Sequence, residues 1–163
     1  MTIAQKRNYC CDMAKGDIII HMDDDDYYPP ESVSCRVKIL MKYRENGILC
    51  VGSSKIGLYD IIENKSAIIG DGNLSLSEAS MGYWRIFWEQ QKFNEFEETG
   101  EYRVVLEGRF ENVMDIPFSF VICAIKHPFN MVNKKINNKY NFNFYDGWDE
   151  EVQDFIVSLR KSL

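Results

Sequence analysis

Four consecutive aspartates, Asp23 to Asp26, form the densest group of carboxylates in this 163-residue chain. They directly follow a short β-branched run, residues 17–22, of the kind that forms a strand buried on both faces. Alternate residues of an extended segment face the same way, so Asp23 and Asp25 can point at one spot. Crowded carboxylates repel one another, and a cation stabilises the cluster by neutralising it. Oxygen ligands favour Mg²⁺ or Mn²⁺, which keep positions open for phosphate oxygens.

The four aspartates Asp23 to Asp26, named the acidic block below, can also be interpreted as something other than a metal site. A run of aspartates is often only a solvated acidic turn. An EF-hand loop starting at Asp23 is excluded, because Tyr28 stands where glycine is required and Ser34 where the bidentate glutamate belongs. A phosphatase-type aspartyl nucleophile ranks low, because Tyr27 occupies the place of its usual small follower. Metal binding and a solvated turn therefore remain the competing interpretations.

The composition predicts one acidic globular domain over residues 1–163. Lys and Arg number 19 against 25 Asp and Glu, a formal net charge of −6, and 45% of the residues are hydrophobic. A sequence pI near 5.0 argues against a nucleic-acid partner or an anionic membrane. The five cysteines form no C-x-x-C motif, which indicates a reducing compartment. With no signal peptide and no apolar run of transmembrane length, the prediction is a cytoplasmic protein without a transmembrane segment.

The elements that must position the aspartates follow from hydrophobic patterning. In the helix expected after Pro30, apolar residues recur at spacings of three and four and predict a buried face. These residues are Val33, Val37, Leu40 and Met41. Helices are predicted over residues 3–14, 31–46, 83–92 and about 149–160, and strands over 17–22, 48–52, 56–62, 66–69 and 118–125.

Three segments around the acidic block together resemble the centre of a family 2 glycosyltransferase of the GT-A fold. They are Ala4-Gln5-Lys6-Arg7-Asn8, Ala14-Lys15-Gly16-Asp17-Ile18-Ile19 and His21-Met22-Asp23-Asp24-Asp25-Asp26-Tyr27-Tyr28. That family has an Arg-Asn on a helix, an Ala-x-Gly-(Asp/Glu) entry to a strand, and a D-x-D motif at the end of the strand. The combination is specific, whereas D-x-D alone is not. Four aspartates followed by Tyr-Tyr-Pro are similar to viral and bacterial members, and the likeness extends more weakly to about residue 130.

The resemblance implies a fold and a set of roles around the strand and D-x-D motif at 17–26. The fold would be a GT-A-like α/β domain with a mixed, mostly parallel sheet flanked by helices. Asp23 and Asp25 would hold Mn²⁺ or Mg²⁺ together with the diphosphate of a nucleotide-sugar donor. Asp26 would lie near the sugar and act in catalysis, and Arg7 would fix the donor side. The metal would assist departure of the diphosphate as a Lewis acid.

An inverting transferase also needs a general base that takes the proton of the acceptor hydroxyl. In the family this acid follows an aromatic-rich helix, and residues 76–127 resemble that acceptor and base region. Glu101 is the predicted base, with Glu98 and Glu97 as alternatives. A different interpretation is that these acids only stabilise the start of a helix through its dipole.

One histidine and three aromatic residues are further candidates. Members of the family often place a late histidine beside the metal or the diphosphate, so His127 is a candidate ligand, although a structural role is the alternative. Tyr83, Trp84 and Trp88 either stack on an acceptor sugar or belong to the core.

The resemblance departs from the family at its start, because the family's βαβ half that grips the nucleotide base is missing before residue 3. We expect a fragment, a domain completed by another chain or a second copy, or a reduced relative. The predicted function is metal-dependent glycosyl transfer, with inversion, from a nucleotide-sugar to a glycan or other hydroxyl. The alternative is a non-catalytic module of similar fold that binds a carbohydrate or a protein partner.

Overall fold

The computed structural model describes residues 1–63, 65–70, 72–96, 102–128, 130, 154, 155, 158 and 161. The described helices are α1 (Ile3–Met13), α2 (Ser32–Lys42), α3 (Arg85–Gln90) and α4 (Tyr102–Leu106). The strands are β1 (Ile18–Ile20), β2 (Cys50–Gly52), β3 (Ile56–Asp60), β4 (Lys65–Ile69), β5 (Gly82–Trp84), β6 (Val113–Asp115) and β7 (Cys123–Lys126). Short 3₁₀ helices cover Arg44–Asn46, Glu78–Ser80, Phe110–Asn112 and Phe118–Phe120.

The described strands form two mixed sheets, in the orders β1-β5-β2-β6 and β4-β3-β7. The predicted mixed α/β class is confirmed. The expected predominance of parallel pairs is wrong for the described strands, because only β2–β6 and β3–β7 are parallel, whereas β1–β5, β2–β5 and β3–β4 are antiparallel. Two features cause this: β3 and β4 form a tight hairpin, and β5 runs between β1 and β2 in the opposite direction.

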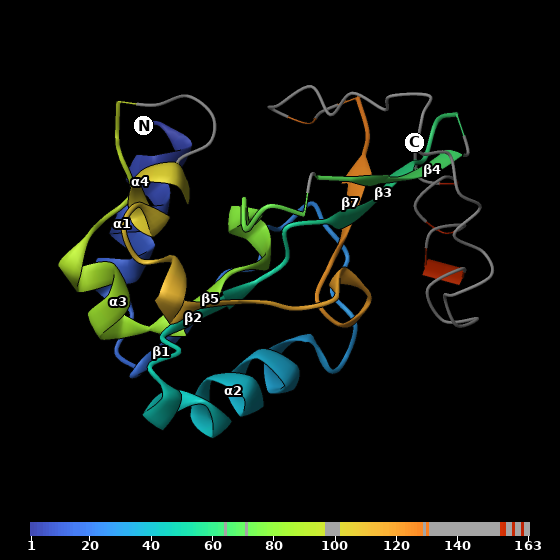
Figure 1. The fold of residues 1–163 in the computed structure, drawn as a ribbon. Coiled ribbons are helices and arrows are strands. Elements are labelled where there is room, and N and C mark those ends of the chain that lie inside the picture. Colours follow the sequence, from blue (N-terminus) through green and yellow to red (C-terminus); the bar gives the residue numbers. More distant parts are fainter. Residues whose placement is uncertain are drawn as a thin grey trace.

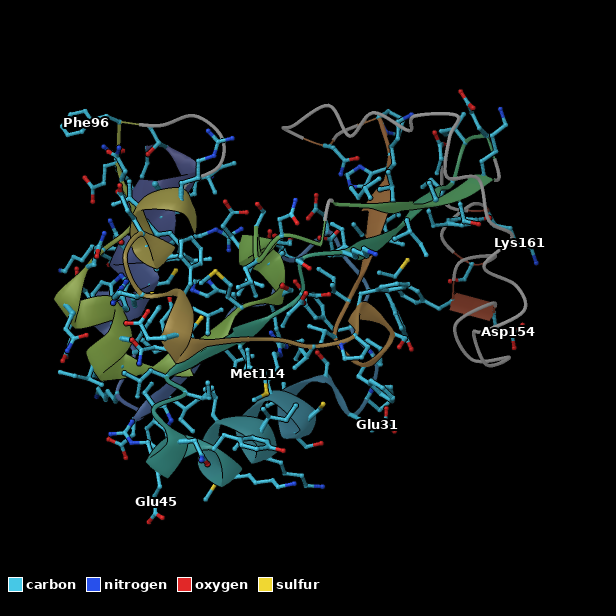
Figure 2. The ribbon with its side chains drawn as sticks, viewed as in Figure 1. Glu31, Glu45, Phe96, Met114, Asp154 and Lys161 are labelled. Atoms are coloured by element: carbon cyan, nitrogen blue, oxygen red, sulfur yellow. The ribbon has the colours of Figure 1, made fainter. Side chains whose placement is uncertain are left out.

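Helices cover both faces of the four-stranded sheet, and Figure 1 shows α1, α3 and α4 grouped apart from α2. Successive strand residues face opposite sides, so each strand contributes to two cores. Ile19, Cys50, Tyr83 and Val113 pack in the core that includes residues of α1, α3 and α4. Their neighbours Ile18, Val51, Trp84 and Met114 pack in the core that includes Leu40 of α2, and Figure 2 labels Met114 beside that helix.

The buried face of α2 differs from the predicted one. Arg36 and Leu40 have no exposed surface, whereas Val33 is 43% and Met41 63% exposed. Ser32, Arg36 and Leu40 are spaced by four residues and face the sheet. The apolar spacing therefore identified the helix and the burial of Leu40 correctly, but Ser32 and Arg36 take the buried positions that it assigned to Val33 and Met41.

Two other predicted elements are corrected. The strand expected over 118–125 is a 3₁₀ turn at Phe118–Phe120 followed by β7, because Val121 has a φ of −120° and a ψ of −55°, which is not extended. The helix expected over 83–92 begins only at Arg85, because Tyr83 and Trp84 belong to β5. The predicted C-terminal helix falls mostly on residues outside those described.

Asp60 is the buried carboxylate of the second sheet, 2% exposed at the end of β3. It accepts hydrogen bonds from the Ile62 and Glu63 amides and from Lys126 Nζ, the last at 2.7 Å. Burial alone would raise the pKa of Asp60, but these hydrogen bonds outweigh burial and hold it below its ordinary value.

We expect Asp60→Asn to lower the free energy of unfolding at pH 7 by about 2 kcal/mol, because Lys126 loses its partner. A lowered folded-state pKa stabilises the protein above the unfolded pKa, and this contribution disappears as the pH falls through the folded value. Urea unfolding at pH 7 and pH 3 measures both effects. The wild type should lose more stability than Asp60→Asn on acidification, and equal losses would contradict this role.

Candidate active site

The acidic block begins immediately beyond β1 and is fixed to two neighbouring segments. The His21 amide donates to the Met81 carbonyl at 2.9 Å, which continues the β1–β5 pairing past Ile20. Tyr27 then forms an antiparallel bridge with Cys123. The aspartates therefore turn between β5 on one side and β7 on the other.

Asp23 is held by Arg7, which lies on α1. Arg7 Nη1 and Nη2 donate to Asp23 Oδ1 and Oδ2, each at 2.9 Å, in a bidentate pair. The Arg7 side chain is 11% exposed and that of Asp23 33%. A capping box between Thr2 and Gln5 begins α1 and sets the position of Arg7 in its second turn.

The backbone of Asp23 is fixed as well. Its amide donates to Tyr28 Oη at 2.7 Å, and the Tyr28 hydroxyl donates to the Ala79 carbonyl at 3.1 Å. Burial raises the pKa of Tyr28 above its ordinary value, so this hydroxyl keeps its proton. Asp23 is thus anchored through both its side chain and its main chain.

Asp25 lies beside His127, as β7 places that histidine at the acidic block. His127 Nε2 is 3.4 Å from Asp25 Oδ2. The side-chain nitrogen Nδ2 of Asn130 is 3.0 Å from Asp25 Oδ2, 2.9 Å from His127 Nε2 and 3.2 Å from the Ile125 carbonyl oxygen. Acceptor atoms of Asp25, His127 and Ile125 therefore converge on one position. The positively polarised side-chain N–H group of Asn130 occupies that position.

The other two aspartates differ from each other. Asp26 is half-buried, and its Oδ1 accepts the Ile125 amide at 2.9 Å, which ties the block to β7. Asp24 is exposed. The predicted base Glu101 and its alternatives Glu97 and Glu98 lie outside the described residues.

The aromatic candidates are mostly core residues. Tyr83 is fully buried and Trp88 is 2% exposed, so neither can stack on an acceptor sugar in this structure. Trp84 is half-buried on the α2 side, with the guanidinium of Arg44 4.1 Å from its ring centre.

The model of one protein family, glycosyl transferase family 2, matches residues 2–113, which is more than half of the chain. The chain belongs to this family. Glycosyl transfer is therefore the reaction class of this family 2 glycosyltransferase. The matched segment runs from the start of α1 to the start of β6 and includes the whole acidic block, whereas His127 lies beyond it. No curated protein matches the chain.

The described part of this glycosyltransferase was compared with the requirements of a metal site and of a membrane-spanning helix. No group of three or more His, Cys, Asp and Glu side chains there is arranged to hold a metal ion. The Asp25–His127 pair offers two ligands of the type that Mn²⁺ accepts. Asp23 accepts one hydrogen bond from Arg7 on each carboxylate oxygen, which leaves lone pairs on both oxygens for a cation. None of the described helices is long and apolar enough to cross a membrane.

Sequence reasoning missed two residues that organise this end of the glycosyltransferase. The first is His21, whose Nδ1 lies 3.3 Å from Arg7 Nη1. Burial, together with the charges of Arg7 and Arg36, lowers the pKa of His21 to about 3, so its ring is neutral at neutral pH. Arg36 donates to the His21, Ser80 and Met81 carbonyls from the α2 side. A charged residue at a spacing of four from Leu40 was the available signal for Arg36.

Proposed function

We propose that this chain transfers a sugar from a nucleotide-diphosphate donor to an acceptor hydroxyl, with inversion and with the help of Mn²⁺ or Mg²⁺. Asp25 and His127 would hold the ion, with Asp23 as a further ligand through the lone pairs that its hydrogen bonds to Arg7 leave available. The observation that carries the proposal is the convergence of Asp25 and His127, residues far apart in the sequence, at the end of β1. When bound, the cation neutralises the leaving diphosphate.

The remaining roles are assigned to this chain's own side chains. Arg7 neutralises Asp23 through the bidentate pair, which lowers the repulsion that an approaching diphosphate meets from the acidic block. Asp26, fixed by the Ile125 amide, lies toward the sugar and assists catalysis. Glu101, which directly precedes α4 in the sequence, accepts the proton of the acceptor hydroxyl.

Thermal unfolding of the full chain tests this proposal. UDP or GDP with Mn²⁺ should raise the melting temperature by about 5 °C or more at concentrations well above Kd, because ligand binding stabilises only the folded state. The same nucleotide with EDTA should give a smaller shift. An unchanged melting temperature with every nucleotide diphosphate at millimolar concentration would contradict donor binding and favour the non-catalytic alternative.

A further inference from the structure

A continuous line of polar side chains runs from the core to Asp23. Cys11 Sγ is 3.2 Å from Tyr83 Oη, and Tyr83 Oη is 2.5 Å from His21 Nε2. His21 Nδ1 is 3.3 Å from Arg7 Nη1, and the Arg7 guanidinium pairs with both oxygens of Asp23. Cys11, His21 and Tyr83 are buried, so water does not compete for the contacts among these three residues. We name these five residues the relay.

The direction of each hydrogen bond in the relay follows from its fixed donor. A guanidinium can only donate, so His21 Nδ1 must accept from Arg7. In the neutral ring the proton then sits on Nε2, which donates to Tyr83 Oη. The Tyr83 hydroxyl is left to donate to Cys11 Sγ. The donor of each contact from Arg7 to Cys11 is thus assigned, and the opposite histidine tautomer would set the N–H groups of His21 Nδ1 and Arg7 Nη1 against each other.

Three elements bring the relay together. Arg7 and Cys11 are four residues apart on α1 and so lie on the same face of that helix. His21 follows β1, and Tyr83 lies on β5 in the core that packs against α1. The ring of Phe93 meets the His21 ring edge-on at 5.6 Å, which restrains the imidazole from turning.

We propose that His21 and Tyr83 are positioning residues, which set the orientation of the Arg7 guanidinium against Asp23. The functional consequence, tighter binding of the donor diphosphate, rests on the proposed function. Burying a hydroxyl costs free energy unless it is hydrogen-bonded, and a phenylalanine at position 83 would fill nearly the same volume without that cost. The Tyr83 hydroxyl therefore contributes through its hydrogen bonds rather than through packing. The hydroxyl fixes the imidazole, and the imidazole fixes Nη1 of Arg7, which also donates to Asp23 Oδ1.

The Tyr83→Phe variant tests the relay, with Tyr59→Phe as the matched control. Tyr59 is a buried tyrosine of the second sheet, in a separate core cluster. We expect Tyr83→Phe to raise the Kd for UDP or GDP with Mn²⁺ about 5- to 10-fold, since the loss of one hydrogen bond corresponds to roughly that factor. Tyr59→Phe should leave Kd unchanged. Equal Kd values for Tyr83→Phe and wild type would overturn the functional consequence.

Nuclear magnetic resonance tests the positioning itself without any donor. The chain has two histidines, so the ¹⁵N spectrum of His21 can be assigned, and we expect protonated Nε2 and unprotonated Nδ1. Rotation about the Arg7 guanidinium C–N bonds should quicken in Tyr83→Phe and not in Tyr59→Phe. The opposite tautomer, or unchanged Arg7 rotation in Tyr83→Phe, would overturn the proposal.

A second variant guards against a folding defect in Tyr83→Phe. His21→Asn keeps a side-chain oxygen near the Nδ1 position but cannot reach Tyr83, so it should quicken Arg7 rotation less than His21→Leu. Equal rates in the two variants would contradict the role of His21. A wild type that binds no nucleotide but gives the expected tautomer and Arg7 rotation would refute the proposed function alone.

Discussion

Asp25→Asn is expected to lower kcat/KM for glycosyl transfer about 10³-fold, because the proposed metal would lose a charged ligand and with it several kcal/mol of stabilisation of the leaving diphosphate. The folded structure should survive. The Asp25 side chain is 38% exposed, and its carboxylate contacts Asn130 and His127. Asparagine keeps the size of the side chain and removes only the charge.

Asp24→Asn is the matched control for this prediction. It removes the same charge from the next residue, whose side chain is exposed. Release of UDP or GDP from a panel of nucleotide-sugars measures the reaction without a known acceptor, and electron paramagnetic resonance of Mn²⁺ measures metal binding separately. If Asp24→Asn loses Mn²⁺ and activity while Asp25→Asn keeps both, the ligand assignment is wrong.

The strand and the block it carries could be predicted because their signal is local. An Ile-Ile-Ile run followed by aspartates allows few alternatives to a buried strand with a polar end, and the structure has β1 there. Helix α1 was predicted within one residue of its observed end at Met13. These segments carry the family's motifs, so the family could also be recognised from the sequence.

Other elements could not be predicted because non-local pairing decides them. Gly82 belongs to β5 because it pairs with Ile20 and Val51, although the aromatic residues that follow it continue a helical pattern. The apolar run over 118–125 does not distinguish a continuous strand from a partly exposed 3₁₀ turn followed by a shorter strand. The approach of His127 to Asp25 depends on the pairing of β7 with β3 and on the bridge from Cys123 to Tyr27.

Arg36 shows most clearly how tertiary structure overrides a sequence pattern. It is fully buried on α2, and in the described part of the chain no carboxylate pairs with it. Its guanidinium instead donates to the Ser32 hydroxyl and to backbone carbonyls of Ser32, His21, Ser80 and Met81. Burial lowers the pKa of Arg36 to about 10, which still leaves it charged at neutral pH.

Gly82 lies between the side chains of Ile20 and Arg36. A Cβ atom there would lie 2.6 Å from Ile20 Cδ1 and 3.5 Å from Arg36 Cβ and Cδ. A larger residue at position 82 would displace the end of the Ile20 side chain, whereas its contact with the stem of Arg36 would be an ordinary van der Waals contact. Arg36 thus joins α2, β1 and β5 at the point where the acidic block begins.

We therefore expect Arg36→Met to lower the free energy of unfolding by about 3–5 kcal/mol, which corresponds to a fall in melting temperature of about 10 °C. Methionine fills much of the volume but leaves the His21 and Ser80 carbonyls without their guanidinium donor. Lys38→Met, an exposed position on the same helix, removes the same charge and should change the melting temperature by less than about 2 °C.

Arg36→Lys distinguishes the charge from the geometry of the guanidinium. Lysine keeps the charge but cannot donate to Ser32 and to the strand-end carbonyls at once, so most of the destabilisation should remain. Urea unfolding of the three variants gives the free energies. If Arg36→Met is as stable as Lys38→Met, the carbonyls at the end of β1 do not depend on Arg36, and the acidic block is held in place by Arg7, Tyr28 and β7 alone.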